Sequence, residues 1–335
     1  MKRDKLVDCL KGYACFLVVF GHVIMGIRNA GIVCPAYSEK LEMFIWSFHV
    51  ALFFFLSGYV YNITGEWRRK KTRSRFILYK FINLGIPYIV FSCIYIILNS
   101  LISSTNHNNS INDIIWIWKT PVAQYWFLYT LFILFAIWAV LSKILKNWQI
   151  TILLVIIYYI CFFSSISLPF LERGLPYALC FGIGTSLDNL KIKEINNAKK
   201  IGLIVLHVLL VNAFIFTNIT GKPFIDDIEE VLGIMASIAL ISLAIERINV
   251  KKILMFINRY SLPIYLLHTI FTAGIRTVLM KIGIGNYVVN VVAGIILGIF
   301  APICIAILAN KSTVLEIFFY PTKTVEKLRG EKTND

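Results

Sequence analysis

Ten long apolar runs, separated by short polar segments, constrain the fold of this chain more than any other feature. A helix needs about 20 mostly apolar residues to cross the hydrocarbon core of a bilayer. The runs therefore predict ten membrane-spanning helices. The predicted spans cover residues 10–27, 41–63, 76–101, 125–145, 149–166, 174–189, 201–217, 228–245, 261–280 and 287–309.

The composition supports the same class of protein. Hydrophobic residues make up 58% of the 335-residue chain and charged residues only 15%, whereas a soluble domain carries about 25% charged and 45–50% apolar residues. The excess apolar surface must face lipid, so we expect an all-α, polytopic integral membrane protein. The seven cysteines show no C-x-x-C spacing and predict neither a disulfide framework nor a zinc site. We expect no bound metal.

The lysine and arginine residues set the predicted orientation. If the N-terminus is cytoplasmic and the spans alternate, 25 of the 33 basic residues lie in inside segments or at the cytoplasmic ends of spans, and six lie in outside segments. This asymmetry follows the positive-inside rule and places both termini in the cytoplasm. Because the basic residues lie in short loops, the net charge of +15 does not indicate nucleic acid as a partner. We expect one transmembrane domain over residues 1–309 and a short cytoplasmic tail over 310–335.

The first predicted span contains two ionisable residues, Lys11 and His22, which are costly in a membrane and usually functional. They are eleven residues apart, which is about three helical turns plus 20°, so they share one face about 16 Å apart. Asp8 precedes Lys11 by three residues and is placed to pair with it. The alternative is that Lys11 extends to the interface while His22 bonds a neighbouring helix. The spacing alone leaves both open.

Three further histidines lie in apolar runs. His49 precedes several phenylalanines and the small residues Ser57 and Gly58, which permit close helix packing. Taken alone, this run favours a packing helix with one hydrogen-bonded histidine. His268 has a similar setting, and His207 has no motif around it, so a structural role is favoured for His207.

Two motifs in the N-terminal part resemble those of a known family, the membrane acyltransferase family 3 and its fucose 4-O-acetylase-like branch. The segment Asp8-Cys9-Leu10-Lys11-Gly12, followed by Gly21-His22, is similar to the signature of the family's first span. The segment Phe48–Tyr59 is similar to its second signature, with Ala51 where proline is common. The remaining matches, in chain order, are Lys80, Pro87-Tyr88, Trp126-Phe127-Leu128, Asn258, Ser261, Tyr265 and His268.

The resemblance implies a fold of about ten spans and a transfer of an acyl group, usually acetyl, from cytoplasmic acetyl-CoA to a carbohydrate hydroxyl. Acetyl-CoA is then a donor substrate, and no bound cofactor is expected. The other partners are the carbohydrate acceptor and membrane lipid. We expect a multi-pass protein of the plasma membrane, in a bacterium the cytoplasmic membrane.

The resemblance also assigns roles. His22 is the candidate catalytic base or acyl carrier, because imidazole suits proton transfer near neutral pH. His49 is the second candidate catalytic residue. Together with Ser57, a candidate substrate-binding residue, it would support the tunnel or orient His22, and His268 is a further candidate of this kind at the substrate site. Lys11, with Asp8 beside it, and the basic cluster over residues 68–80, Lys80 included, would bind the CoA phosphates.

Two other functions remain open from the residues alone. One is a polar-solute transporter or flippase with a proton relay of histidines, although no inverted repeat supports it. The other is a membrane-embedded interaction protein, which leaves the intramembrane histidines unexplained.

Overall fold

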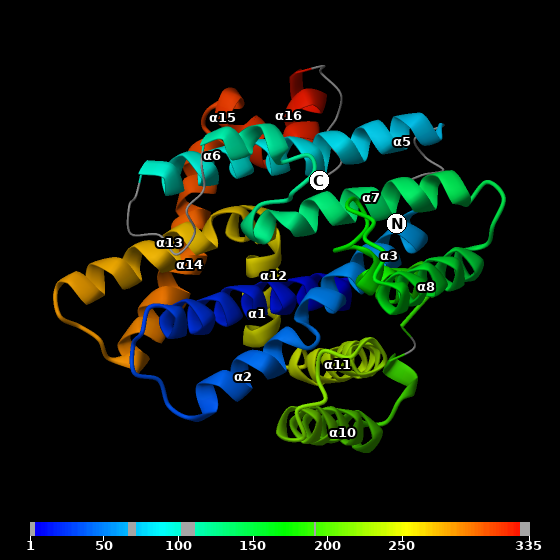
Figure 1. The fold of residues 1–335 in the computed structure, drawn as a ribbon, viewed down its shortest axis with the longest axis horizontal. Helices are drawn as coiled ribbons and strands as arrows, with labels where there is room; N and C mark the ends of the chain where they lie inside the picture. The colour runs from blue at the N-terminus through cyan, green and yellow to red at the C-terminus, as the bar shows by residue number, and fades with distance from the viewer. Residues whose placement is uncertain (1–3, 66–71, 102–110, 191, 329–335) are drawn as a thin grey trace. The chain divides into compact units, whose positions relative to one another are not determined.

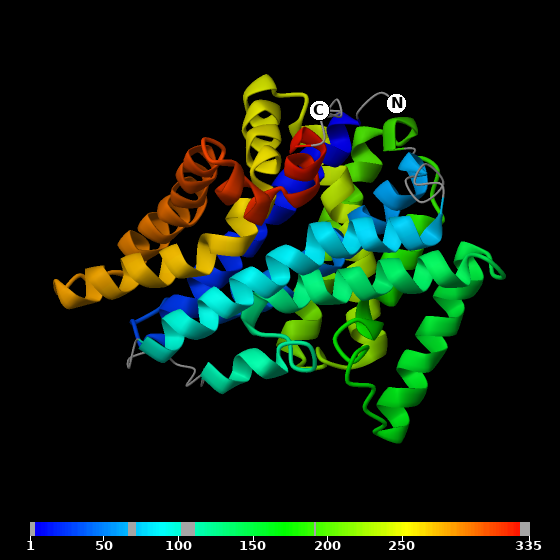
Figure 2. The same ribbon diagram turned by 90° about the horizontal axis from the view of Figure 1, so that it is seen from above.

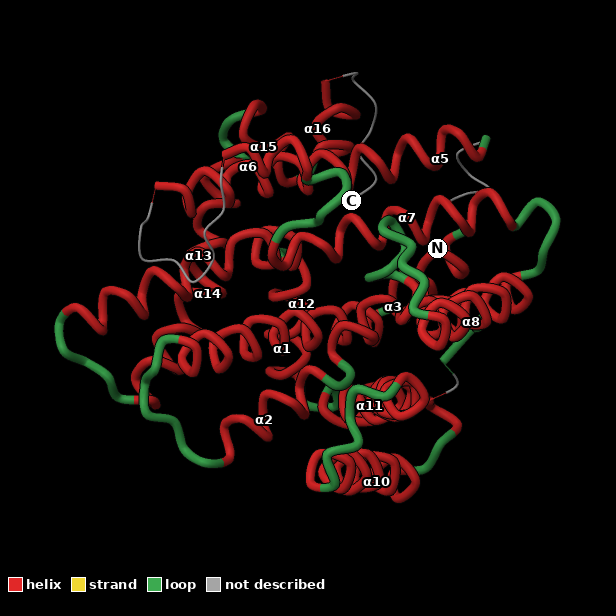
Figure 3. The backbone as a smooth tube through the Cα atoms, in the orientation of Figure 1, coloured by secondary structure: helices red, strands yellow, loops and turns green. Residues whose placement is uncertain are grey.

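The structure is a computed structural model that describes residues 4–65, 72–101, 111–190 and 192–328. Helices dominate these residues, and no strand occurs among them, as Figure 3 shows. The all-α prediction is therefore confirmed.

Eight helical segments of the described residues are long and apolar enough to cross a membrane. They are Lys5–Asn29, Tyr37–Thr64, Arg73–Ser100, Ala123–Leu141, Asn147–Ser164, Asn197–Phe216, Ser261–Lys281 and Tyr287–Ala309. A polytopic membrane protein is thus confirmed, and each of these segments corresponds to one predicted span. The count of ten and the cytoplasmic termini remain predictions.

The other two predicted spans are also helical but differ in character. The run 174–189 contains the short helices η4 (Leu175–Tyr177) and α9 (Ala178–Thr185). The run 228–245 lies in α11 (Pro223–Ala244), whose first two turns carry four acidic residues. Helix α9 is too short, and α11 too highly charged, to be counted among the eight.

The chain divides into two compact units. The first contains Met1–Thr64 and Ile183–Ile307, and the second contains Gly65–Gly182 and Leu308–Asp335. Figures 1 and 2 show the helices of each unit in two views. The sequence-predicted site residues outside the basic cluster over residues 68–80 all belong to the first unit.

The first unit is built around α1 (Lys5–Asn29), an unbroken helix of about 37 Å. The carboxylate of Asp4 caps its start by accepting from the Leu6 backbone N–H at 2.9 Å. The other helices are α2 (Tyr37–Trp46), α3 (His49–Thr64), η5 (Ile192–Glu194), α10 (Asn197–Phe216), α11, α12 (Ile248–Arg259), α13 (Ser261–Lys281) and α14 (Tyr287–Ala309). Helices α10 and α11 pack side by side (Figure 1).

One face of α1 forms an apolar core of this unit with residues of α12, α13 and α14. Its buried members are Cys15, Val19, Val23, Ile27, Ile32, Ile257, Ile264, Ile299 and Ile303. The four residues Cys15 to Ile27 recur at every fourth position, as expected for one helix face. Burial of this stripe fixes which face of α1 turns toward α13.

The second unit contains a helix that runs from α5 (Arg73–Lys80) through the π-helical turn η1 (Phe81–Gly85) into α6 (Ile86–Leu101). Figure 2 shows it alongside α7 (Trp126–Leu141). The other elements are η2 (Ile111–Trp116), η3 (Ala123–Tyr125), α8 (Asn147–Ser164), η4, most of α9, α15 (Thr313–Phe319) and α16 (Pro321–Leu328).

The segment after residue 309, predicted as a tail, contains α15 and α16. The Phe319 ring contacts the Phe91 ring of α6 at 5.4 Å between centroids. Lys323 and Lys327 lie 3.7 and 3.5 Å from the buried carboxylate of Glu316. The ring contact attaches the segment to α6, and the two ion pairs hold α15 and α16 together.

Candidate active site

Three histidines from three helices of the first unit and one tryptophan are linked by successive ring contacts. We call His22, Trp46, His49 and His268 the histidine cluster. The rings of His22 and His268 are 5.0 Å apart between centroids. The indole of Trp46 meets His22 at 5.3 Å and His49 at 5.0 Å, both edge to face. Residues that are far apart in the sequence therefore form one continuous group.

His22 is the member that lies on α1. Because α1 is a single helix from Lys5 to Asn29, Lys11 and His22 do share one face, about 16 Å apart along the axis. Both side chains are half-buried. Trp46 is 36% exposed, so the cluster is not sealed within the unit.

His49 lies at a break in the predicted second span. Helix α2 ends at Trp46 and α3 begins at His49, so residues Ser47 and Phe48 form a turn between them. The Nδ1 atom of His49 is 2.8 Å from the backbone oxygen of Ile45. A carbonyl oxygen can only accept, so this Nδ1 carries a proton and donates it.

His268 is held in the same way on α13. Its Nδ1 lies 3.0 Å from the oxygen of Ile264 and 2.9 Å from that of Tyr265. Its Nε2 is buried and has no hydrogen-bond partner. In the neutral imidazole, Nδ1 is therefore the donor and Nε2 holds the lone pair.

The two flanking histidines thus present the same chemistry. With Nδ1 protonated and bonded to the helix backbone, the neutral rings of His49 and His268 each have a basic Nε2. The backbone carbonyls fix both rings, as an orienting partner does for catalytic or metal-bound histidines. An arrangement of this kind can receive, hold and pass on a proton.

Close packing of α1 on α12 sets the position of the cluster. A Cβ atom on Gly12 would lie 2.8 Å from the carbonyl carbon of Leu254, and nearer still to its oxygen. Only glycine permits this approach between backbones. The buried carboxylate of Asp8 accepts from the Asn258 side-chain amide at 3.1 Å. The first sequence motif and the last are therefore joined directly.

Contacts along α1 follow the chain order of α12 and α13. Gly12 meets Leu254, the Cys15 thiol lies 3.8 Å from the Ser261 oxygen, and His22 meets His268 further along. The residue numbers rise together on both sides, so α1 and α13 run parallel. This parallel register places the two imidazoles at the same level.

The other predicted site residues lie outside the cluster. Ser57 is half-buried on α3, eight residues beyond His49, or about 12 Å along the helix. Lys80 belongs to the second unit, where its Nζ lies over the Phe135 ring at 4.3 Å. Of the basic cluster, residues 68–71 fall outside the described residues. The roles of Ser57 and Lys80 stay predictions.

His207 differs from the three cluster histidines. Its buried ring lies against Phe48 at 5.0 Å and Phe44 at 5.1 Å. Neither ring nitrogen has a hydrogen-bond partner. This setting among aromatic rings agrees with the structural role favoured by the sequence.

Sequence reasoning missed Trp46. The available signal was its position three residues before His49, in a segment that is otherwise helical and apolar. On one uninterrupted helix, Trp46 and His49 would share a face. The sequence gives no indication that this face contacts His22 on another helix. Only the ring contact with His22 on α1 identifies Trp46 as a candidate site residue.

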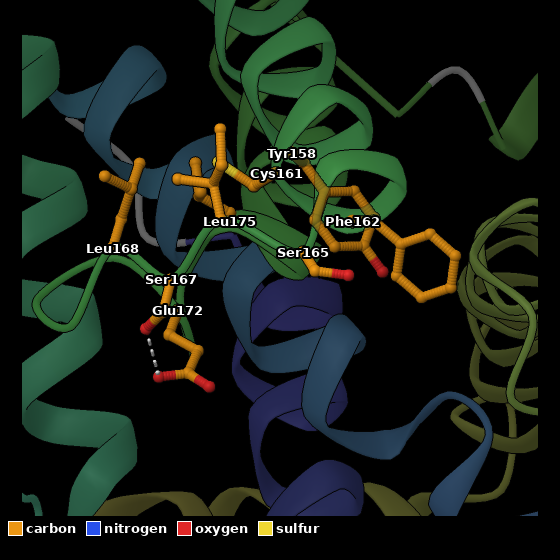
Figure 4. Close-up of a pocket in the computed structure, with 9 residues that line it drawn as sticks. Tyr158, Cys161, Phe162, Ser165, Ser167, Leu168, Glu172 and Leu175 are labelled. Carbon is orange, nitrogen blue, oxygen red and sulfur yellow. Dashed lines mark hydrogen bonds between the residues drawn. The ribbon is translucent and has the colours of Figure 1, made fainter.

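The second unit has a surface cavity of about 370 Å³ between the end of α8 and η4, drawn in Figure 4. It is lined by Tyr158, Cys161, Phe162, Ser165, Ile166, Ser167, Leu168, Glu172 and Leu175. The Ser167 hydroxyl donates to the Glu172 carboxylate at 3.4 Å, the contact marked in Figure 4. None of the predicted site residues lines this cavity, so the histidine cluster remains the candidate active site.

The comparison with protein families matches nearly the whole chain. A family model described as an acyltransferase domain covers residues 4–310. The chain belongs to acyltransferase family 3. No curated protein and no solved structure matches it. The match includes every residue of the histidine cluster, together with Asp8, Lys11 and Asn258. An acyltransferase requires an acyl donor and an acceptor, and a multi-pass membrane protein of this family must bind both.

Proposed function

We propose that the protein transfers an acyl group, with acetyl the expected one, from cytoplasmic acyl-CoA to a hydroxyl of a cell-surface carbohydrate or its lipid-linked precursor. The family supports acyl transfer. The contact between the His22 and His268 rings, with His49 joined to His22 through Trp46, supports a base for the reaction and is the observation that carries the proposal. The membrane would be the plasma membrane, in a bacterium the cytoplasmic membrane.

In the proposed reaction His22 is the general base. A carbohydrate hydroxyl is a weak nucleophile, and the unprotonated ring nitrogen of His22 takes its proton as the oxygen attacks the thioester carbonyl carbon. The carbon–sulfur bond then breaks, and the proton passes from His22 to the leaving CoA thiolate. The His268 ring, which packs 5.0 Å from the His22 ring between centroids, would help to hold its orientation.

A covalent route uses the same residues. The His22 nitrogen would attack the thioester itself, release CoA, and then pass the acyl group to the hydroxyl. Initial-rate kinetics separate the two routes, because a covalent intermediate gives ping-pong kinetics and direct transfer gives sequential kinetics.

The donor would approach from the Lys11 end of α1. Charge-assisted bonds from Lys11 would hold CoA phosphates, and the long pantetheine arm would reach along α1 toward His22. Asp8 bonds Asn258, so its contribution to donor binding would be to fix the start of α1.

The test uses membrane vesicles containing the chain and radiolabelled acetyl-CoA. We expect label to enter the carbohydrate or glycolipid fraction with wild type. His22→Ala should lower this transfer about 10²–10⁴-fold, the usual effect of losing a general base. His207→Ala is the matched control, since it removes another histidine of the same unit, and it should keep transfer within a few-fold.

Two outcomes would contradict the proposal. Transfer by His22→Ala within a few-fold of wild type would remove His22 from the reaction. Failure of the wild type to consume acetyl-CoA, together with uptake of a polar solute, would favour a transporter that uses the same histidines as a proton relay.

A further inference from the structure

Arg276 is a charged residue inside a predicted span that neither the sequence motifs nor the proposed reaction uses. It lies on α13, eight residues beyond His268, and is half-buried. Its guanidinium rests on α1 at Gly26, where an added Cβ would lie 3.2 Å from the Arg276 Cζ and nearer still to Nη1. An ionisable group placed this way in a span is costly and marks a functional site by default.

A second arginine of the same unit, Arg28, is neutralised by carboxylates of the chain and serves as a comparison. Arg28, near the end of α1, donates to the carboxylates of Glu42 and Glu39 on α2. For Arg276, no ion pair or side-chain hydrogen bond occurs within the part of the chain that the structure describes. Among the described residues, therefore, no carboxylate neutralises the charge of Arg276.

The position of this guanidinium along α1 is informative. Gly26 follows His22 by one turn, or about 6 Å, whereas Lys11 precedes His22 by about 16 Å. The order along the helix is thus a lysine, the imidazole pair, and then the Arg276 guanidinium. If the acyl donor occupies the Lys11 end, the acceptor must reach His22 from the Arg276 end.

We propose that Arg276 binds an oxyanion of the acceptor, a phosphate or a carboxylate attached to the carbohydrate. This rests on the proposed function for the identity of the acceptor. A guanidinium offers a planar fork of donors that pairs with two oxygens of such a group, and it keeps its charge when partly buried. Binding there would hold the acceptor hydroxyl one helical turn from the His22 ring.

The test measures anion binding without turnover. Purified protein in phosphatidylcholine nanodiscs is titrated with inorganic phosphate, and the affinity is taken from the rise in the thermal unfolding midpoint. Wild type should be stabilised, and Arg276→Gln should bind at least about ten-fold more weakly, as for the loss of a charge-assisted bond. Arg276→Lys, which keeps the charge without the fork, should lie between them.

Two further variants guard against a folding artefact. Gly26→Ala would press a methyl group on the guanidinium and should weaken phosphate binding while leaving Arg276 in place. Arg28→Gln is the matched control, since Arg28 is already paired with carboxylates, and it should bind phosphate as wild type does.

A parallel titration with phosphatidylglycerol in the nanodiscs distinguishes a lipid headgroup from a free oxyanion. Stabilisation by phosphatidylglycerol alone, lost in Arg276→Gln, would assign the residue to lipid and overturn its role at the acceptor. Equal phosphate binding by wild type and Arg276→Gln would overturn the site itself. The failure of acyl transfer is a separate result, because acetyl-CoA consumption and phosphate binding are measured independently.

Discussion

Gly12→Ala tests the close contact between α1 and α12. The added methyl would lie 2.8 Å from the carbonyl carbon of Leu254, whereas ordinary contacts of a Cβ lie at 3.4–4 Å. The obstacle is helix backbone, which cannot rotate away as a side chain can. The two helices must therefore separate until the contact reaches at least 3.4 Å, and this strains the bond between Asp8 and Asn258.

The cost follows from two opposing effects. Overpacking a well-packed region costs about 1–3 kcal/mol, and a backbone obstacle places this case near the upper value. Alanine regains about 0.5–1 kcal/mol over glycine in a helix interior. The free energy of unfolding should therefore fall by about 2 kcal/mol, or about 30-fold in the folded-to-unfolded ratio.

The assay is thermal or denaturant unfolding of purified protein in one detergent. Gly202→Ala is the matched control, because Gly202 is also helical and an added Cβ there meets nothing within 4 Å. This control should be as stable as wild type or slightly more stable. If Gly12→Ala unfolds at the same midpoint as Gly202→Ala, the reasoning about close packing is wrong.

Three further predictions concern donor binding, the cluster and the topology. Lys11→Ala should raise the KM for acyl-CoA about 10- to 150-fold, as for a lost charge-assisted bond. Lys11→Arg should keep most of the activity. An unchanged KM in Lys11→Ala would return the residue to a structural role. Trp46→Leu should lower kcat about ten-fold, because each aromatic contact contributes about 0.5–1.5 kcal/mol, and should leave the KM for acyl-CoA unchanged. Trp46→Phe should lower kcat less. Equal kcat values for wild type and Trp46→Leu would contradict a role of Trp46 in holding the histidine cluster. Reporter fusions after Lys193 and Lys222 should report inside and outside, respectively, and the reverse result would remove two spans from the count of ten.

The sequence predicted the helices well because hydropathy governs which segments enter a bilayer. It also predicted that Lys11 and His22 share a face, since helical periodicity relates residues on one helix. The pairing of His22 with His268 could not be predicted from spacing, because it depends on the packing of α1 against α13. The motif resemblance identified His22 and His268 as candidate site residues but did not predict that their rings are in contact.

Local geometry was the other limit. Neither proline nor glycine marks the turn at Ser47 and Phe48, so the second span was expected to be one uninterrupted helix. That turn gives His49 its place at the first residue of α3 and its bond to Ile45. The π-helical turn Phe81–Gly85, by contrast, does have a signal in the sequence, because Pro87 lacks the N–H that would bond the carbonyl of residue 83.

The parallel packing of α1 and α13 imposes a parity rule on the topology. Two parallel membrane helices cross in the same direction, so an odd number of crossings must separate them. With α9 and α11 both spanning, seven crossings lie between α1 and α13, and with neither spanning there are five. One of them spanning without the other would make α13 antiparallel to α1 and would separate His22 from His268. Helices α9 and α11 therefore either both cross the membrane or both stay out of it. If both stay out, Lys193 lies outside and Lys222 inside, which is the reverse of the ten-span prediction.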